Sequence, residues 1–270
     1  MLQNRGQKNH ETSMNRINKL FQERKKGILN VYFTAGYPTL NDTLSIAKSL
    51  EVAGADMIEI GIPFSDPVAD GETIQKSNNS ALKNGMSLKL LFDQLEDLRT
   101  NVQIPVILMG YVNPVLQYGV KNFCKRCQEV GVDGVILPDL PMELYQKEYR
   151  KYFDDNGLKM IYLITPQTSE DRIHLIDQAT DGFIYMVSSA STTGGKKEIS
   201  GEQKNYFNRI RSMNLSNPTL IGFGISDAES FSQACEYANG AIIGSAFINA
   251  ISNTENLDAV IKSFIQSIKN

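Results

Sequence analysis

The chain has 270 residues, of which 41% are hydrophobic and 21% are charged, values typical of a globular protein that buries a sizeable core. Its net charge of −3 gives it no basic field for nucleic acid or an anionic membrane, and no apolar run reaches transmembrane length. The polar N-terminal stretch lacks the apolar core of a signal peptide, so we expect a cytoplasmic protein.

Short apolar runs alternate with longer segments of helical periodicity along the chain. The apolar runs predict eight β-strands, at residues 28–35, 56–60, 104–110, 133–138, 158–164, 182–188, 218–223 and 240–244. The periodic segments predict helices at about 41–53, 88–100, 120–130, 142–155, 169–179, 202–213, 227–237 and from near 245. Two further helices are expected at the ends, at 13–25 and 256–268.

Eight strands that alternate with helices indicate a parallel sheet. An open doubly wound sheet is the alternative, but no G-x-G-x-x-G follows the first strand, and eight is the strand number of a (β/α)8 TIM barrel. No linker or low-complexity segment divides the chain. We therefore expect a single barrel domain over residues 1–270, with a flexible tail at residues 1–12.

Few residues are available for histidine or cysteine chemistry. The two histidines are His10, in the polar tail, and His174, in a predicted helix. Cys124 and Cys127 form a C-x-x-C that lies within a predicted helix, where reduced structural thiols are the simpler interpretation. We expect no metal site, and acid/base chemistry falls to Asp, Glu, Tyr or Lys.

Glu59 is a carboxylate in the second predicted strand, DMIEIG. Alternation places Ile58 and Ile60 on one face of this strand and Glu59 on the other, which points into the barrel near the C-terminal ends of the strands. Burial there favours the neutral acid and raises the pKa, which suits a general acid/base. The alternative is a core carboxylate satisfied by a neighbouring donor.

A long, proline-stiffened loop follows this strand at residues 62–71. Long loops at this position of a barrel are often functional. Asp70 lies near its end and is a candidate second carboxylate, although Asp70-Gly71 is also a common turn pair.

The loops after three later strands suggest a phosphate site under a lid. Glycines follow the seventh strand in GFGIS and the eighth in GSA, where phosphate groups usually bind in barrels. A helix that follows such a loop adds its positive N-terminal end. The small, polar segment 189–197 after the sixth strand is typical of a mobile lid, or of a plain surface loop. Four aromatic residues near strand ends suggest a flat apolar substrate: Tyr32, Tyr111, Tyr185 and Phe223.

The run EIGIPFSDPVADG, from Glu59 to Gly71, resembles the signature of tryptophan synthase α chains. Matching segments extend along nearly all of the chain after the first dozen residues: Phe33-Thr34-Ala35-Gly36 with Pro38, Leu108 to Asn113-Pro114, Gly131-Val132-Asp133-Gly134, Pro138-Asp139-Leu140-Pro141, Thr193-Gly194, Gly222-Phe223-Gly224-Ile225-Ser226 and Gly244-Ser245-Ala246. The resemblance implies a lyase of tryptophan biosynthesis that cleaves indole-3-glycerol phosphate into indole and glyceraldehyde 3-phosphate by a retro-aldol reaction.

The resemblance also implies roles for individual residues. Glu59 matches the catalytic glutamate, Asp70 the second catalytic carboxylate, which accepts a hydrogen bond from the indole N–H, and Tyr185 a tyrosine beside the reacting centre. The phosphate-holding positions are matched by Gly194, Gly224, Gly244 and Ser245. The indole pocket, its supports and the lid are matched by Tyr32, Tyr111, Asp139, Phe223 and Thr193.

A partner is implied as well. Chains of this family pair with a β chain that carries pyridoxal phosphate, in an α2β2 heterotetramer through which indole passes, and the α chain needs no cofactor of its own. We expect the loops 63–71 and 110–114 to form the partner surface. Tyr37, Glu72 and Ser189 depart from residues common in relatives, which affects the lid and the partner contacts first.

Two other functions are alternatives to this lyase. An indole-glycerol-phosphate synthase would use a catalytic lysine on an inner strand, and Lys159, at the start of its strand, is the one candidate. A catalytically silent barrel that regulates a β chain would not need Glu59 and Asp70, whose presence favours the lyase.

Overall fold

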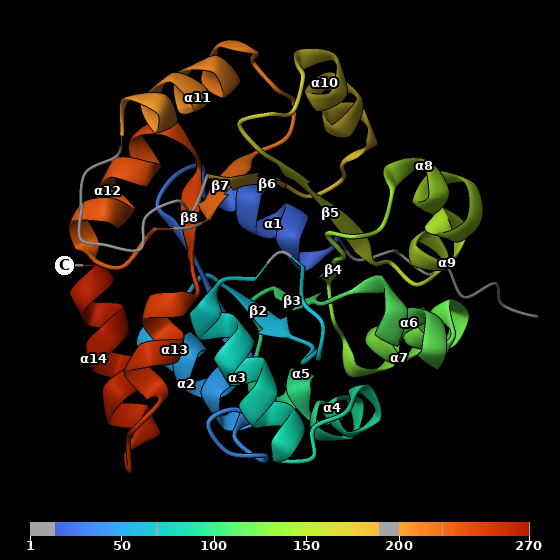
Figure 1. Cartoon of the computed structure of the whole chain (residues 1–270), viewed down its shortest axis with the longest axis vertical. Coiled ribbons are helices and arrows are strands. Elements are labelled where there is room, and N and C mark those ends of the chain that lie inside the picture. Colours follow the sequence, from blue (N-terminus) through green and yellow to red (C-terminus); the bar gives the residue numbers. More distant parts are fainter. Residues whose placement is uncertain (1–13, 69, 189–199, 223, 270) are drawn as a thin grey trace, which may run out of the picture.

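The computed structural model describes residues 14–68, 70–188, 200–222 and 224–269. Its centre is a closed barrel of eight parallel strands in sequence order, from β1 to β8, in which β1 also pairs with β8 (Figure 1). The strands are β1 Ile28–Thr34, β2 Met57–Gly61, β3 Val106–Met109, β4 Gly134–Ile136, β5 Lys159–Ile164, β6 Ile184–Val187, β7 Thr219–Gly222 and β8 Gly240–Ile243. All eight predicted strands and the predicted TIM barrel are confirmed.

Helices surround the barrel in a ring (Figure 1). They are α1 Arg16–Glu23, α2 Thr43–Ala53, α3 Glu72–Lys83, α4 Leu88–Gln94, α5 Leu98–Asn101, α6 Val112–Tyr118, α7 Val120–Val130, α8 Met142–Leu144, η1 Tyr145–Tyr149, α9 Arg150–Asp155, α10 Glu170–Ala179, α11 Gly201–Ser212, α12 Ala228–Tyr237, α13 Ser245–Ile251 and α14 Leu257–Lys269. The two extra helices expected at the ends of the chain are confirmed as α1 and α14. The expected tail at residues 1–12 lies outside the described residues.

Two helices are absent from the sequence prediction. The 12 residues of α3 bury Ser77, Asn78 and Ala81, so the helix lacks the apolar stripe by which a helix is recognised. The other is α6, which begins at Val112 and carries Pro114 in its first turn, where proline is tolerated. The segment 110–114, expected to be a loop, is therefore partly helical.

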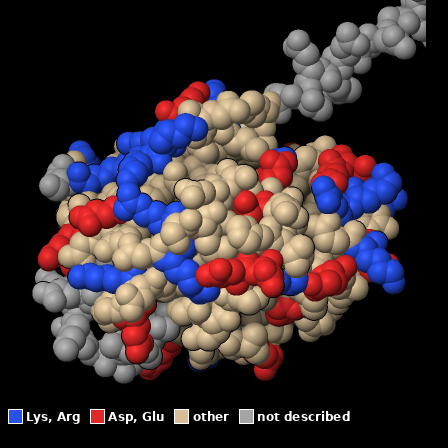
Figure 2. Space-filling view, turned by 90° about the horizontal axis from the view of Figure 1, so that it is seen from above, with Lys and Arg blue, Asp and Glu red and all other residues tan. Residues whose placement is uncertain are grey.

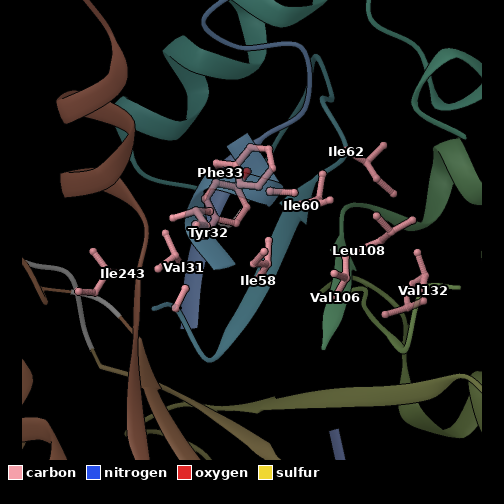
Figure 3. Close-up of a cluster of buried hydrophobic side chains, with 14 of the residues drawn as sticks. Val31, Tyr32, Phe33, Ile58, Ile60, Ile62, Val106, Leu108, Val132 and Ile243 are labelled. Carbon is pink, nitrogen blue, oxygen red and sulfur yellow. The ribbon is translucent and has the colours of Figure 1, made fainter. Parts of the chain in front are cut away.

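The alternation of each strand produces two cores. Outward side chains pack against the ring of helices; Figure 3 shows Val31, Phe33, Ile58 and Ile60 in this layer. A smaller cluster fills the interior, and each strand or the residue just before it supplies at least one member: Ile28, Met57, Ile107, Ile136, Ile161, Phe183, Tyr185, Leu220 and Ile242. Residues of β2 thus divide as the alternation predicts.

The helix α1 closes the N-terminal end of the barrel, here called the closed end. Its side chains Ile17 and Phe21 join the interior cluster, and α1 lies across the strands in Figure 1. The side chain of Asn15, the N-cap of α1, donates to the backbone oxygens of Asp133 (2.9 Å) and Gly157 (3.0 Å), which precede β4 and β5. The opposite, C-terminal end of the strands is the mouth.

The C-x-x-C pair lies on α7, with both thiols free and buried. Burial raises the pKa of Cys124 to about 12 and that of Cys127 well above its ordinary value. Thiols that resist ionisation are poor nucleophiles, which agrees with the interpretation as structural thiols. In the described parts of the chain, no helix is long and apolar enough to cross a membrane.

Candidate active site

Glu59 lies in the middle of β2, inside the barrel. Its Cα pairs in register with that of Tyr32 on β1 and that of Ile107 on β3. The glutamate side chain is completely buried. Met57, two residues earlier on the same face, belongs to the interior cluster. The carboxyl group therefore lies between that apolar layer and the mouth, as the alternation predicts.

Among the described residues, burial and one neutral amide act on the protonation state of this carboxyl group. Desolvation raises the pKa of Glu59 to about 8, although a hydrogen bond from Asn30 lowers it. The Asn30 amide donates from Nδ2 to Glu59 Oε1 at 2.5 Å, and Glu59 Oε2 has no partner among the described residues. The neighbouring donor expected for a purely structural core carboxylate is thus present, but it satisfies only one of the two oxygens of Glu59. At neutral pH the side chain is mainly a neutral acid with a free oxygen.

Two tyrosines stand beside Glu59 because two glycines make room for them. A Cβ on Gly61 of β2 would lie 2.1 Å from the hydroxyl of Tyr32, and a Cβ on Gly222 of β7 would lie 2.2 Å from the hydroxyl of Tyr185. Real side chains never come so close, so both positions require glycine. Burial raises the pKa of each tyrosine far above its ordinary value, so both hydroxyls stay protonated.

Asp70 joins this group from the loop 62–71. The pKa of Tyr185 is raised further by the charges of Glu59 and Asp70, which places the three side chains around one space. Burial raises the pKa of Asp70, while hydrogen bonds from Tyr111 and Asn78 lower it. The Asn78 amide lies 3.4 Å from Asp70 Oδ2. The side chain of Asp70 thus reaches residues far from its own turn.

Tyr111 and Asp139 connect this loop to the next part of the mouth. Tyr111 is the N-cap of α6 and is buried, and its ring lies 5.3 Å from that of Phe64 in the loop 62–71. Both carboxylate oxygens of Asp139, after β4, accept from the backbone N–H of Val112 at 2.9 and 3.1 Å. Asp139 therefore supports the start of α6.

The candidate phosphate residues lie on adjacent strand ends. β7 and β8 pair as far as Gly222 and Ile242, and Gly224 and Gly244 follow these two strands. Gly224 has a φ of 77°, a left-handed conformation that favours glycine. Gly244 lies against Tyr32, and Ser245 begins α13. Thr193, Gly194 and Phe223 lie outside the described residues.

Two polar residues of this site were not predicted. Asn30 is the only amide of β1, on the face that points into the barrel, and an amide within a predicted buried strand is the signal that could have identified it. Asn78 lies on α3, the helix that the sequence did not predict. Over the described ranges, no three His, Cys, Asp or Glu side chains are arranged to hold a metal ion.

Comparison with known proteins places this chain in a family. The family model described as tryptophan synthase alpha chain matches residues 18–270. The tryptophan synthase alpha chain of Flavobacterium psychrophilum is 58% identical over 255 residues, which cover 94% of this chain and 100% of the relative. That of Phocaeicola vulgatus is 54% identical over 258 residues, covering 95% and 100%.

Similar solved structures indicate the same family. The crystal structure of the tryptophan synthase alpha chain from Legionella pneumophila has a TM-score of 0.83 at 35% identity and covers 96% of this chain and 98% of that one. A chain of the tryptophan synthase complex from Pyrococcus furiosus has a TM-score of 0.79 at 35% identity, covering 90% and 98%. The fold, the family model and the relatives lead to one conclusion: the chain belongs to the tryptophan synthase alpha chain family and to tryptophan biosynthesis.

Proposed function

We propose that this chain is a lyase that cleaves indole-3-glycerol phosphate into indole and glyceraldehyde 3-phosphate by a retro-aldol reaction. The observation that carries the proposal is Glu59, a fully buried carboxyl with a pKa of about 8 and one oxygen without a partner, inside the barrel of a member of this family. A group that titrates near neutral pH can both give and take a proton.

The neutral Glu59 acts first as the acid. Its proton goes to the indole carbon that bears the glycerol phosphate side chain, which leaves a positive charge on the indole ring. The resulting carboxylate then takes the proton of the adjacent hydroxyl. As that oxygen becomes the aldehyde, the carbon–carbon bond breaks and its electron pair returns to the ring, so Glu59 ends the cycle protonated.

Asp70 and Tyr185 act on the charge and the position of the substrate. The Asp70 carboxylate accepts a hydrogen bond from the indole N–H and stabilises the positive ring. Tyr111 and Asn78 support this role, because their hydrogen bonds favour the charged form of Asp70. Tyr185 lies beside the reacting carbon. The buried Tyr32 forms a wall of the indole pocket, with Phe223 as a further expected member.

The phosphate group binds at the mouth, over the ends of β7 and β8. We assign it to the backbone near Gly224, Gly244 and Ser245, together with Gly194 of the expected lid, while Thr193 closes toward Asp70. The adjacency of β7 and β8 and the left-handed Gly224 support this placement. Glu59 and this site would hold the two ends of one substrate.

The proposal includes a β chain as partner, in an α2β2 heterotetramer in which the β chain carries pyridoxal phosphate and receives indole. Similar solved structures include a tryptophan synthase complex from Pyrococcus furiosus and a tryptophan synthase from M. tuberculosis in its aminoacrylate-bound form. The expected partner surface, the loops 63–71 and 110–114, carries Val68, which is 83% exposed, and Leu116, two residues beyond the second loop on α6, is 47% exposed. Exposed apolar side chains beside a mouth suit a partner interface. We take the whole chain as one domain that works in the cytoplasm.

Indole release from the purified chain tests the lyase directly. We expect the wild type to release indole from indole-3-glycerol phosphate slowly alone and faster with a β chain, since partner binding would order the loops. Glu59→Gln keeps the shape and should lower the rate by about 10²-fold or more, while inorganic phosphate still binds. No indole from the wild type in either condition would favour the silent regulator, and an active Glu59→Gln variant would remove Glu59 as the acid/base.

A lysine-dependent synthase is disfavoured by the position of Lys159. This residue begins β5 and pairs with Asp181, which precedes β6, so the ammonium group lies at the closed end of the barrel. Glu59 and the mouth lie toward the other end.

A further inference from the structure

The side chain of Asn30 is buried inside the barrel beside Glu59. It lies on the inward face of β1 between Ile28 and Tyr32, pairs in register with Met57, and is completely buried. Among the described residues, the one hydrogen bond of its amide is the donation from Nδ2 to Glu59 Oε1, and its Oδ1 has no partner.

A buried amide with a single hydrogen bond lowers the stability of the fold. Burial of a polar group costs free energy unless hydrogen bonds replace those lost to water, and here only half of the amide is satisfied. A leucine of similar size would fill the same space without that cost. The amide has no described hydrogen bond to α1 or to the backbone of the neighbouring strands, and its one described polar contact is the side chain of the candidate acid/base.

The oxygen of Glu59 that lacks a described partner, Oε2, indicates what the contact with Asn30 does. Oε1 of Glu59 accepts the amide N–H, which favours the carbonyl form of that oxygen and leaves Oε2 as the oxygen that carries the proton. Since Oε2 has no partner in the described structure, its proton is free to move to a substrate. The pair bridges two adjacent strands of a closed barrel, which are rigid supports for a fixed geometry.

We propose that Asn30 is a positioning residue for the proton transfer: its amide holds Oε1 of Glu59 and directs the exchangeable proton to Oε2. This inference rests on the proposed lyase function. Asn30 does not touch the substrate; it acts through Glu59, keeping one oxygen aimed at the reacting carbon during both the donation and the removal of the proton.

The charge balance around Glu59 supports the same role. Burial raises the pKa of Glu59, and the hydrogen bond from Asn30 is the contact that opposes this rise. Among the described residues, the other titratable groups that face this space are Tyr32 of β1, Tyr185 of β6 and Asp70 of the loop 62–71. Burial raises the pKa of both tyrosines far above the working pH range, so both remain neutral there.

Asn30→Leu is the test, with Ile28→Val as the matched control. The first removes the amide at similar volume, and the second changes packing on the same face of the same strand without a polar contact. We expect Asn30→Leu to raise the pKa of Glu59 by about one pH unit or more, because the anion loses its donor. We also expect about a tenfold lower kcat with KM little changed. Ile28→Val should alter neither the pKa nor kcat.

The pKa is read from the carboxyl 13C resonance of labelled glutamate, assigned with Glu59→Gln, and kcat from indole release. An unchanged pKa in Asn30→Leu, or a loss of kcat that Ile28→Val reproduces, would overturn the inference. If Asn30→Leu does not fold, the smaller, β-branched Asn30→Val carries the same expectation. A raised pKa in a protein whose wild type releases no indole would reject the lyase while keeping the contact between Asn30 and Glu59.

Discussion

At the closed end of the barrel Asp133 lies between two guanidinium groups, whereas toward the mouth Glu59 lies against a neutral amide. Asp133 pairs with Arg99 at 2.6 Å and with Arg16 of α1 at 3.0 Å, and it also accepts the N–H of Val106 at 2.9 Å. Both carboxyl groups are almost completely shielded from water. The partners of Asp133 are cations, whereas the described partner of Glu59 is neutral, and burial raises the pKa of Glu59.

The pattern at the closed end repeats. Asp56, before β2, pairs with Lys269 at 3.1 Å and with Arg24 beside α1. Burial opposes the ionisation of Asp181, but hydrogen bonds from Lys159 and from Asn18 of α1 outweigh it and keep its pKa below the usual range. These aspartates and Asp133 hold α1 against the barrel. On the face drawn in Figure 2, charges are also mixed, with blue and red atoms side by side.

We expect the carboxylates that pair with cations to stabilise the fold, and Glu59, which has no such pair in the described structure, to exchange protons. Polar groups aimed at chemistry are left partly unsatisfied, at a cost in stability that the rest of the fold must offset. The two ends of the barrel should therefore respond to mutation with opposite signs.

The largest expected effect is a gain of stability in Glu59→Gln. A carboxyl whose folded pKa is raised from 4.5 to about 8 contributes its full stability below pH 4.5 and loses it as the pH rises through 8. At pH 9 the buried carboxyl group therefore lowers the free energy of unfolding of the wild type by up to about 5 kcal/mol, whereas the glutamine does not. We expect urea unfolding to show a more stable variant at pH 9 and little difference at pH 5. A variant that is less stable at pH 9 would contradict the comparison.

The next effect is a loss of stability in Asp133→Asn. Removal of the charge leaves the guanidinium groups of Arg99 and Arg16 without their anion, at a cost of about 3 kcal/mol in the free energy of unfolding. Asp154→Asn is the control, since Asp154 forms an exposed pair with Arg150 on α9 that contributes little. Urea unfolding should separate the two variants, while indole release per folded molecule stays near wild type. Equal stabilities would mean that Asp133 does not anchor α1.

A smaller effect is expected from Asp70→Asn, this time on catalysis. The amide cannot balance the positive ring, so kcat/KM for indole release should fall by about 10²-fold. Asp66→Asn makes the same change at an exposed position of the same loop and should leave the rate of the isolated chain unchanged. Similar losses in both variants would assign the effect to the loop rather than to the Asp70 carboxylate.

The sequence predicts some features of the barrel and its site and misses others. Eight apolar runs alternating with helical segments predicted the barrel, and the alternation within the second strand predicted the inward Glu59 and its raised pKa, because these follow from local pattern and burial. The helix α3 was missed because its buried face uses Ser77 and Asn78, which carry no apolar signal. Asn30 was missed because its importance depends on Glu59, 29 residues away on the neighbouring strand. Local patterns predict which face is buried, but not which side chain meets another across it.

The pH dependence of kcat/KM for the isolated wild type tests the central claim most directly. If Glu59 must be protonated to start the cycle, kcat/KM should be level near neutral pH and fall about tenfold per pH unit above pH 8, since the acid form disappears there. A rate that rises through pH 8, or one that stays level to pH 10, would show that the neutral acid is not the working form of Glu59.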